Sequence, residues 1–384
     1  MMWVAWCLSG FVLLAWILIS AAMLTGARRC GWLDQNLPDE PSSPQRLSVV
    51  VPARNEEASV EPAMRSLLAL DYPDMEVIAV DDRSEDHTGA ILDRLAAEDI
   101  RLRVVHVHDL PEGWLGKTNA LQAGGELASG EWILFTDADV IFAPDALRRA
   151  VHLAQSRRLD HLALFPNLIM KGFWESLFLG FFGVMFCWFY RPWEASDPHS
   201  RGYVGMGAFN LVRTDTYRLA GGHIDLRLAI VDDVELGHHL KMSGAHSDCQ
   251  ASGSLVRVRW LQGLGGAVRG LTKNTFAGMG FRPAAVIFQS AALVLISVWP
   301  AVGLFVGAAG SRGLCIAAVA GMMISSRAVV FGRSPNPLYG LGYPLAGLIF
   351  AFTMWRSMFR TYRNGGVIWR GTLYPLDLLR GRKR

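Results

Sequence analysis

Short apolar runs alternate with amphipathic stretches through the first half of the chain. The apolar runs cover residues 47–51, 76–80, 101–107 and 132–135, and each has the length of a buried strand. The stretches between them, at 56–70, 86–98 and 117–128, have helical spacing. Strands that alternate with helices predict an α/β fold with a doubly wound, mostly parallel sheet.

Much longer apolar runs lie at the two ends of the chain. They cover residues 1–24, 284–309, 314–331 and 338–355, and runs of this length can cross a bilayer. Positive charge follows the first run at Arg28 and Arg29, whereas a cleaved signal peptide would carry it in front. We therefore expect a transmembrane anchor over 1–27 and two to three membrane segments over 284–356. The composition agrees, since 51% of residues are hydrophobic, 18% are charged and the mean hydropathy is +0.25.

Charge and composition between these segments predict the topology. Because positive residues favour the cytoplasmic side, the domain after the anchor is expected in the cytoplasm. A linker over 28–46, rich in Pro and Ser at 37–45, leads into a domain over 47–275. The basic tail at 357–384 is also expected to be cytoplasmic, so the segment at 338–355 is predicted to be re-entrant or interfacial.

One apolar and aromatic segment, at 172–190, interrupts the predicted domain. Its length would allow a span, but a span would separate two parts of one site. An interfacial helix or the lining of a lipid groove is the interpretation we favour, and a core helix is the alternative. The net charge of +3 does not indicate a nucleic-acid partner, and five scattered cysteines without a Cys-x-x-Cys predict neither zinc nor disulfides.

Charged residues follow three of the predicted strands. They are Arg54 and Glu56 after the first, Asp81 and Asp82 after the second, and Asp137 and Asp139 after the fourth. Because ligands of such sheets bind at the carboxyl ends of the strands, these side chains are expected along one rim. Two carboxylates that face the same way repel each other unless a hard cation lies between them, and Mg²⁺ brings substrate phosphates with it. The alternative is that these aspartates begin helices.

Four acidic motifs then occur in a fixed order. They are Val49–Glu57, Val80–Thr88, Thr136–Asp139 and Val231–Leu236; Gly221-Gly222-His223 precedes the last and Arg259-Trp260 follows it. This ordered set resembles glycosyltransferase family 2, inverting enzymes with the GT-A nucleotide-sugar fold, over roughly residues 47–260. The strings Gly113–Asn119, Ile230–Asp233 and Gly366–Gly371 look like the hopene-associated members of bacterial hopanoid gene clusters. Carotenoid and ceramide glycosyltransferases look more distant.

The resemblance implies a role for each matching residue. Pro52, Ala53, Arg54, Glu56, Asp81 and Asp82 would contact the nucleotide, and Asp137 and Asp139 would hold a divalent metal, Mg or Mn, on the donor diphosphate. Asp233 would be the catalytic base, with Asp232 in place of the usual Glu before it. Lys117, in a Gly-Lys turn that opens a helix, suits a phosphate or sugar contact, with a solvated surface lysine as the alternative.

Other positions refine the expected activity. Arg259 would contact phosphate and Trp260 would stack on a sugar or acceptor, while His223 is either an orienting or a structural histidine. Val256 stands where processive and ceramide-type relatives carry Gln or Arg, which favours transfer of a single sugar.

The expected protein is a multi-pass enzyme of the bacterial inner membrane with a cytoplasmic catalytic domain. It would move one sugar from a nucleotide-sugar donor, UDP-linked as the resemblance implies, to a hopanoid-related membrane lipid. A carotenoid or other glycolipid acceptor, or a polyprenyl phosphate, is the alternative. A non-catalytic membrane scaffold is the alternative of another class, and the complete acidic set argues against it. No nucleotide-binding glycine motif follows the first strand, which disfavours P-loop and dinucleotide-binding proteins.

Overall fold

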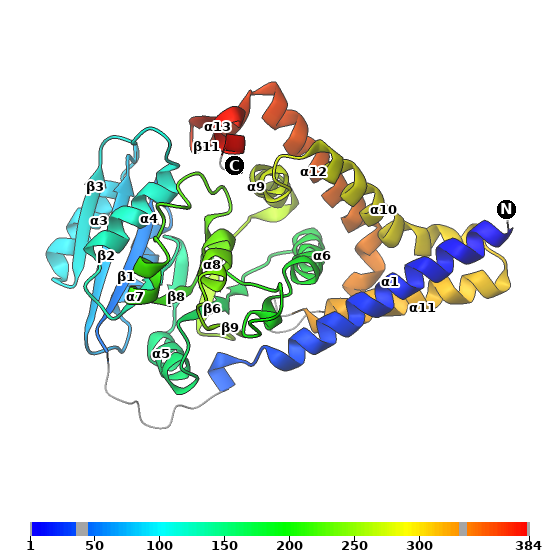
Figure 1. Cartoon of the computed structure of the whole chain (residues 1–384), viewed down its shortest axis with the longest axis horizontal. Helices are drawn as coiled ribbons and strands as arrows, with labels where there is room; N and C mark the ends of the chain where they lie inside the picture. The colour runs from blue at the N-terminus through cyan, green and yellow to red at the C-terminus, as the bar shows by residue number, and fades with distance from the viewer. Residues whose placement is uncertain (1, 36–44, 330–335, 382–384) are drawn as a thin grey trace. The chain divides into compact units, whose positions relative to one another are not determined.

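The computed structural model describes residues 2–35, 45–329 and 336–381, and the chain forms two compact units (Figure 1). The first, here the α/β unit, comprises Cys30–Ile169 and Arg191–Trp260. The second, here the helical unit, comprises Met1–Arg29, Met170–Tyr190 and Leu261–Arg384. Of the linker expected over 28–46, the Pro- and Ser-rich part at 37–45 lies, apart from Gln45, outside the described residues.

The α/β unit is built on a seven-stranded sheet with the order β3-β2-β1-β4-β8-β6-β9. Its strands are β1 (Leu47–Ala53), β2 (Met75–Asp82), β3 (Leu102–Val107), β4 (Trp132–Phe135), β6 (His161–Phe165), β8 (Asn210–Arg213) and β9 (Ser247–Ala251). All neighbours are parallel except β8, which runs antiparallel to β4 and β6. A smaller sheet joins β5 (Val140–Phe142), β10 (Val256–Val258) and β7 (Asn167–Leu168). The predicted α/β fold with a mostly parallel sheet is confirmed.

The first two strands continue further than their apolar runs. β1 reaches Ala53 and β2 reaches Asp82, because Ala53 pairs with Asp81 and the β2 carboxylates pair with His106 and Val107 on β3. Asp81 and Asp82 are thus the last residues of β2, whereas the sequence predicted them just after it. Ladder partners on a neighbouring strand carry the pairing past the point where the side chains turn polar.

The helices of this unit lie close to their predicted positions. They are α2 (Val60–Leu68), α3 (Thr88–Glu98), α4 (Gly116–Leu127), α5 (Ala146–Ser156), α7 (Thr214–Leu219) and α8 (Asp232–Met242), with 3₁₀ turns η1 (Leu33–Gln35) and η2 (Pro192–Glu194). α2 begins four residues later than expected. Asn55 has a left-handed backbone, φ 52°, and the Glu56 N–H bonds to Thr88 Oγ1 at 2.7 Å, so the chain forms a loop there.

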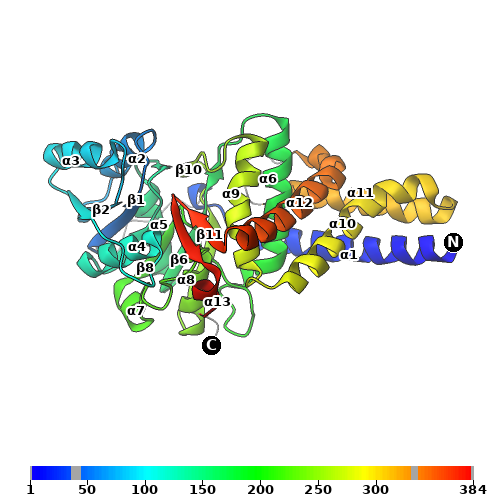
Figure 2. The ribbon, with the colours of Figure 1, turned by 90° about the horizontal axis from the view of Figure 1, so that it is seen from above.

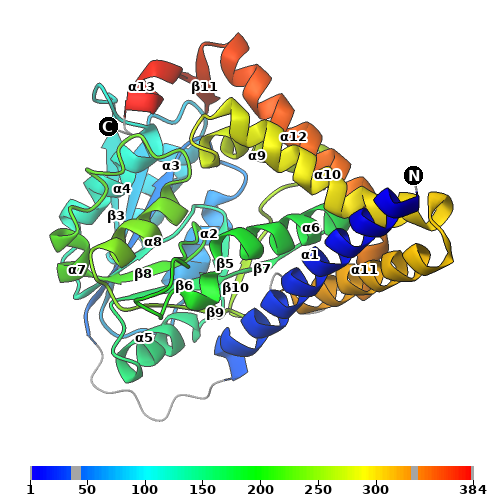
Figure 3. The ribbon, with the colours of Figure 1, turned by 45° about the vertical axis from the view of Figure 1, so that its right-hand side comes forward.

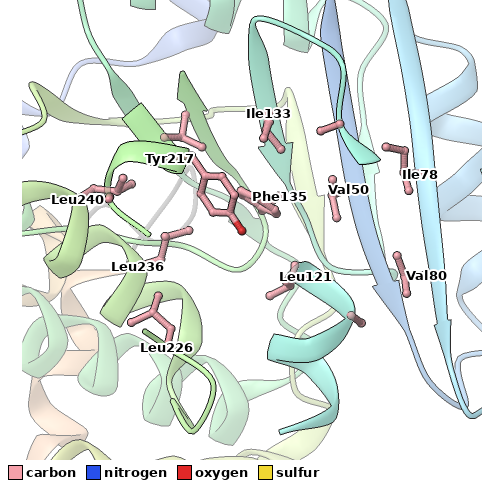
Figure 4. Close-up of a cluster of buried hydrophobic side chains, with 14 of the residues drawn as sticks. Val50, Ile78, Val80, Leu121, Ile133, Phe135, Tyr217, Leu226, Leu236 and Leu240 are labelled. Atoms are coloured by element: carbon pink, nitrogen blue, oxygen red, sulfur yellow. The ribbon is translucent and has the colours of Figure 1, made fainter. Parts of the chain in front are cut away.

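A buried cluster between the sheet and helices α4 and α8 positions the carboxyl ends of the strands (Figure 4). Alternate residues of the central strands point into it, and the labelled members are Val50, Ile78, Val80, Leu121, Ile133, Phe135, Tyr217, Leu226, Leu236 and Leu240. Ile78 and Val80, like Ile133 and Phe135, are two residues apart, the spacing that places side chains on one face of a strand. Burial of these side chains holds the start of α4 and the start of α8 near the end of β4.

The helical unit contains the long apolar helices. They are α1 (Met2–Arg29), α6 (Phe173–Tyr190), α9 (Gly263–Gly278), α10 (Pro283–Val306), α11 (Ala309–Ala328) and α12 (Tyr343–Arg363), with the 3₁₀ turn η3 (Pro337–Gly342). The chain then forms a hairpin of β11 (Gly366–Trp369) and β12 (Thr372–Pro375), followed by α13 (Leu376–Gly381). α1 runs beside α11 along most of its length, as Figures 2 and 3 show.

Buried polar side chains join these helices pairwise. Trp16 Nε1 donates to the Ile296 carbonyl at 2.8 Å, Ser20 and Ser325 lie 3.1 Å apart, and Trp355 Nε1 donates to Ser290 Oγ at 3.0 Å. Among the described residues five helices are long and apolar enough to cross a membrane: those containing α1, α6, α10, α11 and α12. The apolar segments at both ends of the sequence are therefore helices, as expected.

The structure groups two helices differently from the domain expected over 47–275. α6 and α9 belong to the helical unit, where Phe178 and Leu179 of α6 pack against Ala267 and Leu271 of α9. Their apolar faces find partners on other helices instead of on the sheet. The C-terminal part also differs, because α12 continues to Arg363 and most of the described tail is folded: Lys273 of α9 lies 3.5 Å from the centre of the Trp369 ring.

Candidate functional site

Lys117 lies at the centre of the predicted site. Its Nζ is 2.8 Å from Asp137 Oδ1, after β4, and 3.1 Å from Asp232 Oδ2, at the start of α8. Lys117 is the second residue of α4, and burial of Leu121 one turn later holds this helix against the sheet. Three segments far apart in sequence thus meet through one ammonium group. The surface-lysine alternative is wrong, because only 22% of this side chain is exposed.

Asp233 is held by the loop that leads into β8. Its Oδ2 accepts the Gly207 N–H at 2.8 Å, while the Gly207 carbonyl accepts the Asp137 N–H at 3.0 Å. A Cβ on Gly207 would lie 2.6 Å from Asp137 Oδ2 and 3.4 Å from Asp233 Oδ2, so a larger residue would displace a carboxylate. The peptide of Gly207 therefore couples the position of Asp233 to that of Asp137.

These residues line a cavity of about 10 Å³, which is the size of one water. Its walls are Lys117, Leu121, Phe135, Thr136, Asp137, Gly207, Asn210, His223, Asp232, Asp233 and Leu236. The walls come from α4, β4, β8 and α8, from the loop after β4, and from the loops before β8 and α8. A polar pocket with converging carboxylates and one cation is the kind of place where catalytic groups are found.

Two carboxyl groups of the site have raised pKa values. Burial raises the pKa of Asp233 to about 6; the negative charge of Asp232 adds to this and the positive charge of Lys117 opposes it. Burial also raises the pKa of Asp139 to about 7, with further contributions from the charges of Asp137 and Glu56. A carboxylate whose pKa lies near neutrality is suited to accept a proton at physiological pH.

The predicted nucleotide-contacting residues form a second cluster at the ends of β1 and β2. Asp82 accepts two hydrogen bonds from Arg83, at 2.8 and 3.1 Å, and lies 3.8 Å from Arg54. Asp81 accepts the Ser84 N–H at 3.3 Å. Hydrogen bonds between the two loops tie this cluster together, as between the Asn55 N–H and Ser84 Oγ at 3.1 Å. Pro52 and Ala53 are the last two residues of β1, beside Val80 and Asp81 of β2.

The two clusters meet at the start of α4. A Cβ on Gly116 would lie 2.1 Å from Asp82 Oδ2, so the residue before Lys117 is in close contact with the nucleotide cluster. Glu56 adds to the field at Asp139, which links the end of β1 to the residues after β4. All residues predicted at strands β1, β2 and β4 and at helices α4 and α8 are thereby brought to one rim of the sheet.

The predicted metal ligands fit a hard divalent cation. Asp137 and Asp139 supply carboxylate oxygens, the ligand type that Mg²⁺ and Mn²⁺ accept. The raised pKa of Asp139, caused by burial and neighbouring negative charge, means that a cation there would relieve repulsion. Within the described residues no three His, Cys, Asp or Glu side chains surround a common point. Asp137 and Asp139 would be the protein ligands of such a cation, and phosphate oxygens of a donor could complete the set.

Three other predicted residues have distinct surroundings. Arg259 donates from Nη1 to the Ile169 carbonyl at 2.6 Å, and 36% of Trp260 is exposed; neither is among the described residues that line the small cavity. His223 is buried in the cavity wall, and Tyr217 Oη lies 2.7 Å from its Nδ1. Burial lowers the pKa of His223 to about 3, with help from the charge of Lys117, so the ring is neutral.

Sequence reasoning missed several residues that surround the carboxylates. Gly207 and Asn210 belong to no motif, and no local pattern indicates that they reach the site. His106 was also missed, although it lies directly beside Asp81 in the β2–β3 register, with Nδ1 3.0 Å from Asp81 Oδ2. A polar residue at the end of a strand, next to a predicted binding strand, is the signal that could have identified it.

Comparison with known proteins relates this chain to glycosyltransferases. Residues 48–199 match the family model for glycosyl transferase family 2. By this match the segment is similar to family 2 glycosyltransferases. A 4,4'-diaponeurosporenoate glycosyltransferase of Staphylococcus aureus (strain MRSA252) is 27% identical over 352 residues, 86% of this chain and 88% of the relative. The same-named enzyme of strain USA300 is 26% identical over 350 residues, with the same coverage of both chains.

A solved structure extends the match to the fold. The mannosyltransferase PcManGT from Pyrobaculum calidifontis, in complex with GDP-Man and Mn²⁺, aligns over 94% of this chain and 98% of its own, with a TM-score of 0.51 and 16% identity. The transferase therefore has a GT-A fold, and it is an enzyme of the glycosyltransferase class.

Replacement of Lys117 tests the electrostatics of the transferase site. In Lys117→Met the positive charge that lowers the Asp233 pKa is lost, so this pKa is expected to rise above its present value near 6. Activity that needs ionised Asp233 would then begin at higher pH. The pH dependence of kcat/KM should show its acidic limb displaced upward relative to wild type. Lys117→Arg, which retains the charge, is the control, and an unmoved limb in Lys117→Met would contradict the coupling.

Proposed function

We propose that this chain is a membrane-bound inverting glycosyltransferase that moves a single sugar from a UDP-linked donor to a membrane isoprenoid lipid. The observation that carries the proposal is the meeting of Asp137, Lys117 and the Asp232-Asp233 pair around one small polar cavity. This arrangement would give a binding site for the donor diphosphate and a catalytic base on the same rim of the sheet, and direct displacement at an anomeric carbon requires both. The family 2 match over residues 48–199 supports the same chemistry.

On the donor side, the loops after β1 and β2 would bind the nucleotide. Carboxylate oxygens at the end of β2 can accept an N–H of a base, and backbone near Pro52 can approach its ring. Asp137 and Asp139 would hold the divalent metal at the diphosphate. Such a metal, when bound, neutralises the charge that develops on the leaving nucleotide. Lys117 would contact phosphate or sugar oxygens, since it lies beside Asp137 in the first turn of α4.

On the acceptor side, Asp233 would take the proton from a lipid hydroxyl as that oxygen attacks the sugar. The Gly207 N–H orients this carboxylate, and Asp232 keeps Lys117 near it. With a pKa near 6, Asp233 is largely ionised at neutral pH and still basic enough to assist. The mechanism is a single displacement, so the anomeric configuration inverts.

The comparisons favour a carotenoid-type acceptor over the hopanoid expected from the sequence. The curated relatives are named for 4,4'-diaponeurosporenoate, and they match 86% of this chain, well beyond the family 2 domain. Five candidate membrane helices would keep such an acceptor in the bilayer, with the catalytic domain on the cytoplasmic face of a bacterial inner membrane. A hopanoid acceptor is the second candidate, supported by the strings Gly113–Asn119 and Gly366–Gly371.

Lipid analysis tests this function directly. Lipids extracted from cells with and without the gene would be compared by mass spectrometry, with Asp233→Asn as the complementing control. A glycosylated isoprenoid should disappear with the gene, return with the wild-type chain and stay absent with the variant. Incubation of the purified enzyme with UDP-sugars, Mn²⁺ and carotenoid or hopanoid acceptors would then identify the lipid. An unchanged lipid profile together with no transfer to any isoprenoid would contradict the proposal.

A further inference from the structure

We propose that His106 is a positioning residue of the nucleotide subsite, whose imidazolium holds Asp81 and makes nucleotide affinity fall as pH rises. This inference rests on the proposed function, because it takes the end of β2 as the place where the donor base binds. It concerns a residue outside the sequence motifs of the site. The structure nevertheless brings this histidine against one of their buried carboxylates.

The position of His106 between two carboxylates defines its charge. From β3 its Nδ1 lies 3.0 Å from Asp81 Oδ2, on the neighbouring strand, and its Nε2 lies 2.9 Å from Asp93 Oδ1, on α3. A neutral imidazole has one N–H, whereas two ionised carboxylates can only accept. Both hydrogen bonds can therefore form together only when the ring carries two protons and a positive charge.

Asp81 is held in one orientation by its surroundings. The carboxylate is buried, its Oδ2 faces His106, and its Oδ1 accepts the Ser84 N–H at 3.3 Å. A Cβ on Gly89 would lie 2.8 Å from Asp81 Oδ2 and 3.5 Å from His106 Cε1, so α3 closes tightly over the pair. A carboxylate with this little room points where its partners direct it.

Asp82, the next residue, has a different cation. It is paired with Arg83 through two hydrogen bonds and lies 3.8 Å from Arg54. An arginine keeps its charge at every physiological pH, whereas a histidine does not. Asp81 and Asp82 therefore differ in one respect. The cationic partner of Asp81 can lose its positive charge when the pH rises, whereas that of Asp82 cannot.

The direction of the pH effect follows from the charges that face His106. These are Asp93 on α3 and Asp81 on β2, and their hydrogen bonds raise the pKa of His106 above its ordinary 6.5. The two hydrogen bonds that the charged ring donates, here called the clamp, are therefore complete below the ordinary pKa of histidine, and the clamp is lost as the pH rises through the raised pKa of His106. The neutral ring can donate only one of the two hydrogen bonds and no longer supplies a positive charge beside Asp81, so nucleotide binding weakens on the alkaline side.

The test is UDP binding to the full chain in nanodiscs with Mn²⁺, measured by calorimetry from about pH 6 to about pH 9, a range that spans histidine titration. His106→Gln places an amide near the Nε2 position, toward Asp93, and should bind UDP about tenfold more weakly than wild type at the acidic end of this range. His106→Asn places an amide near the Nδ1 position, toward Asp81. It should retain most of the affinity and lose the extra alkaline weakening.

Asp93→Asn separates charge from structure, because Asp93 is exposed and contacts only the far side of the ring. This variant should bind UDP as tightly as wild type at the acidic end, with the loss of affinity displaced to lower pH. Ionisation of UDP and of Mn²⁺-bound water affects wild type and the three variants equally. The effect of the clamp is therefore the difference between their curves of UDP affinity against pH. Identical pH profiles for all four, with UDP bound normally, would overturn the clamp alone. Failure of wild type to bind either UDP or GDP would overturn the proposed function and the clamp with it.

Discussion

Asp233→Asn is expected to bind the donor as wild type does and to transfer sugar to a hydroxyl acceptor about 10³-fold more slowly, the usual contribution of a positioned base. Asparagine has the same shape and its carbonyl oxygen can still accept the Gly207 N–H, which Asp233 accepts at 2.8 Å. It cannot take a proton. In Asp233→Asn, the donor affinity measured by calorimetry should therefore stay at the wild-type value, while the turnover measured as lipid-linked product should fall.

The pH profile adds a second readout for this residue. Since the pKa of Asp233 is raised to about 6, wild-type kcat/KM with a hydroxyl acceptor should rise with pH through that value as the base loses its proton. Asp71→Asn, an exposed carboxylate in a surface ion pair with Arg148, is the matched control and should behave as wild type. Undiminished turnover of Asp233→Asn with an alcohol would contradict the base assignment.

The nature of the acceptor changes what this variant does. The relatives are named for an acid, diaponeurosporenoate, and an acid is already ionised in neutral solution. An ionised acceptor needs little help from a base, so the Asp233→Asn defect should be smaller with a carotenoid acid than with an alcohol. Assay of both acceptors with wild type and variant would therefore identify the nucleophile as well as the base.

Asp139→Ala is expected to abolish metal-dependent transfer while the protein remains folded in membranes. Asp139 is one of two carboxylates after β4, and its pKa is raised to about 7 by burial and by the charges of Asp137 and Glu56. Removal of the side chain relieves that repulsion, so stability should not suffer. It also removes one of the two protein ligands expected for the metal, and turnover should fall by about 10³-fold or more.

Binding measurements distinguish a metal role from a structural one. UDP-sugar affinity in Asp139→Ala should no longer increase when Mn²⁺ is added, whereas the wild type should show this increase. Asp109→Ala, an exposed carboxylate in the same unit, serves as the control. Wild-type turnover by Asp139→Ala in the presence of a chelator would refute the metal assignment.

Several features of the fold could be predicted because their causes are local. Trp132–Phe135 is a strand in the structure at the predicted limits, since four consecutive apolar residues before a polar turn can be buried on both faces. The long apolar helices were predictable for the same reason. The ends of β1 and β2 could not be predicted in this way. Pairing with a neighbouring strand, as between Asp81 and His106, extends each strand beyond its apolar residues.

Assignment of α6 shows the limit of local pattern. Its aromatic, nearly uniform composition predicts burial or membrane contact but not the partner that covers it. The partner proves to be α9 and α12, through Phe178 and Leu271 among others, so the helix joins the helical unit. Apolar surface is non-directional, and many partners could have covered it.

The sequence by itself determined the mostly parallel α/β sheet, the apolar helices at both ends and the glycosyltransferase class, because these depend on short-range periodicity and on motifs read in order. Tertiary structure alone decided which groups meet. It placed Lys117 between Asp137 and Asp232, gave Asp233 a hydrogen bond from the Gly207 N–H, and brought His106 within hydrogen-bond distance of Asp81. Such contacts join residues from separate strands and helices, and their distances follow from how the sheet and its covering helices pack rather than from any local run of residues.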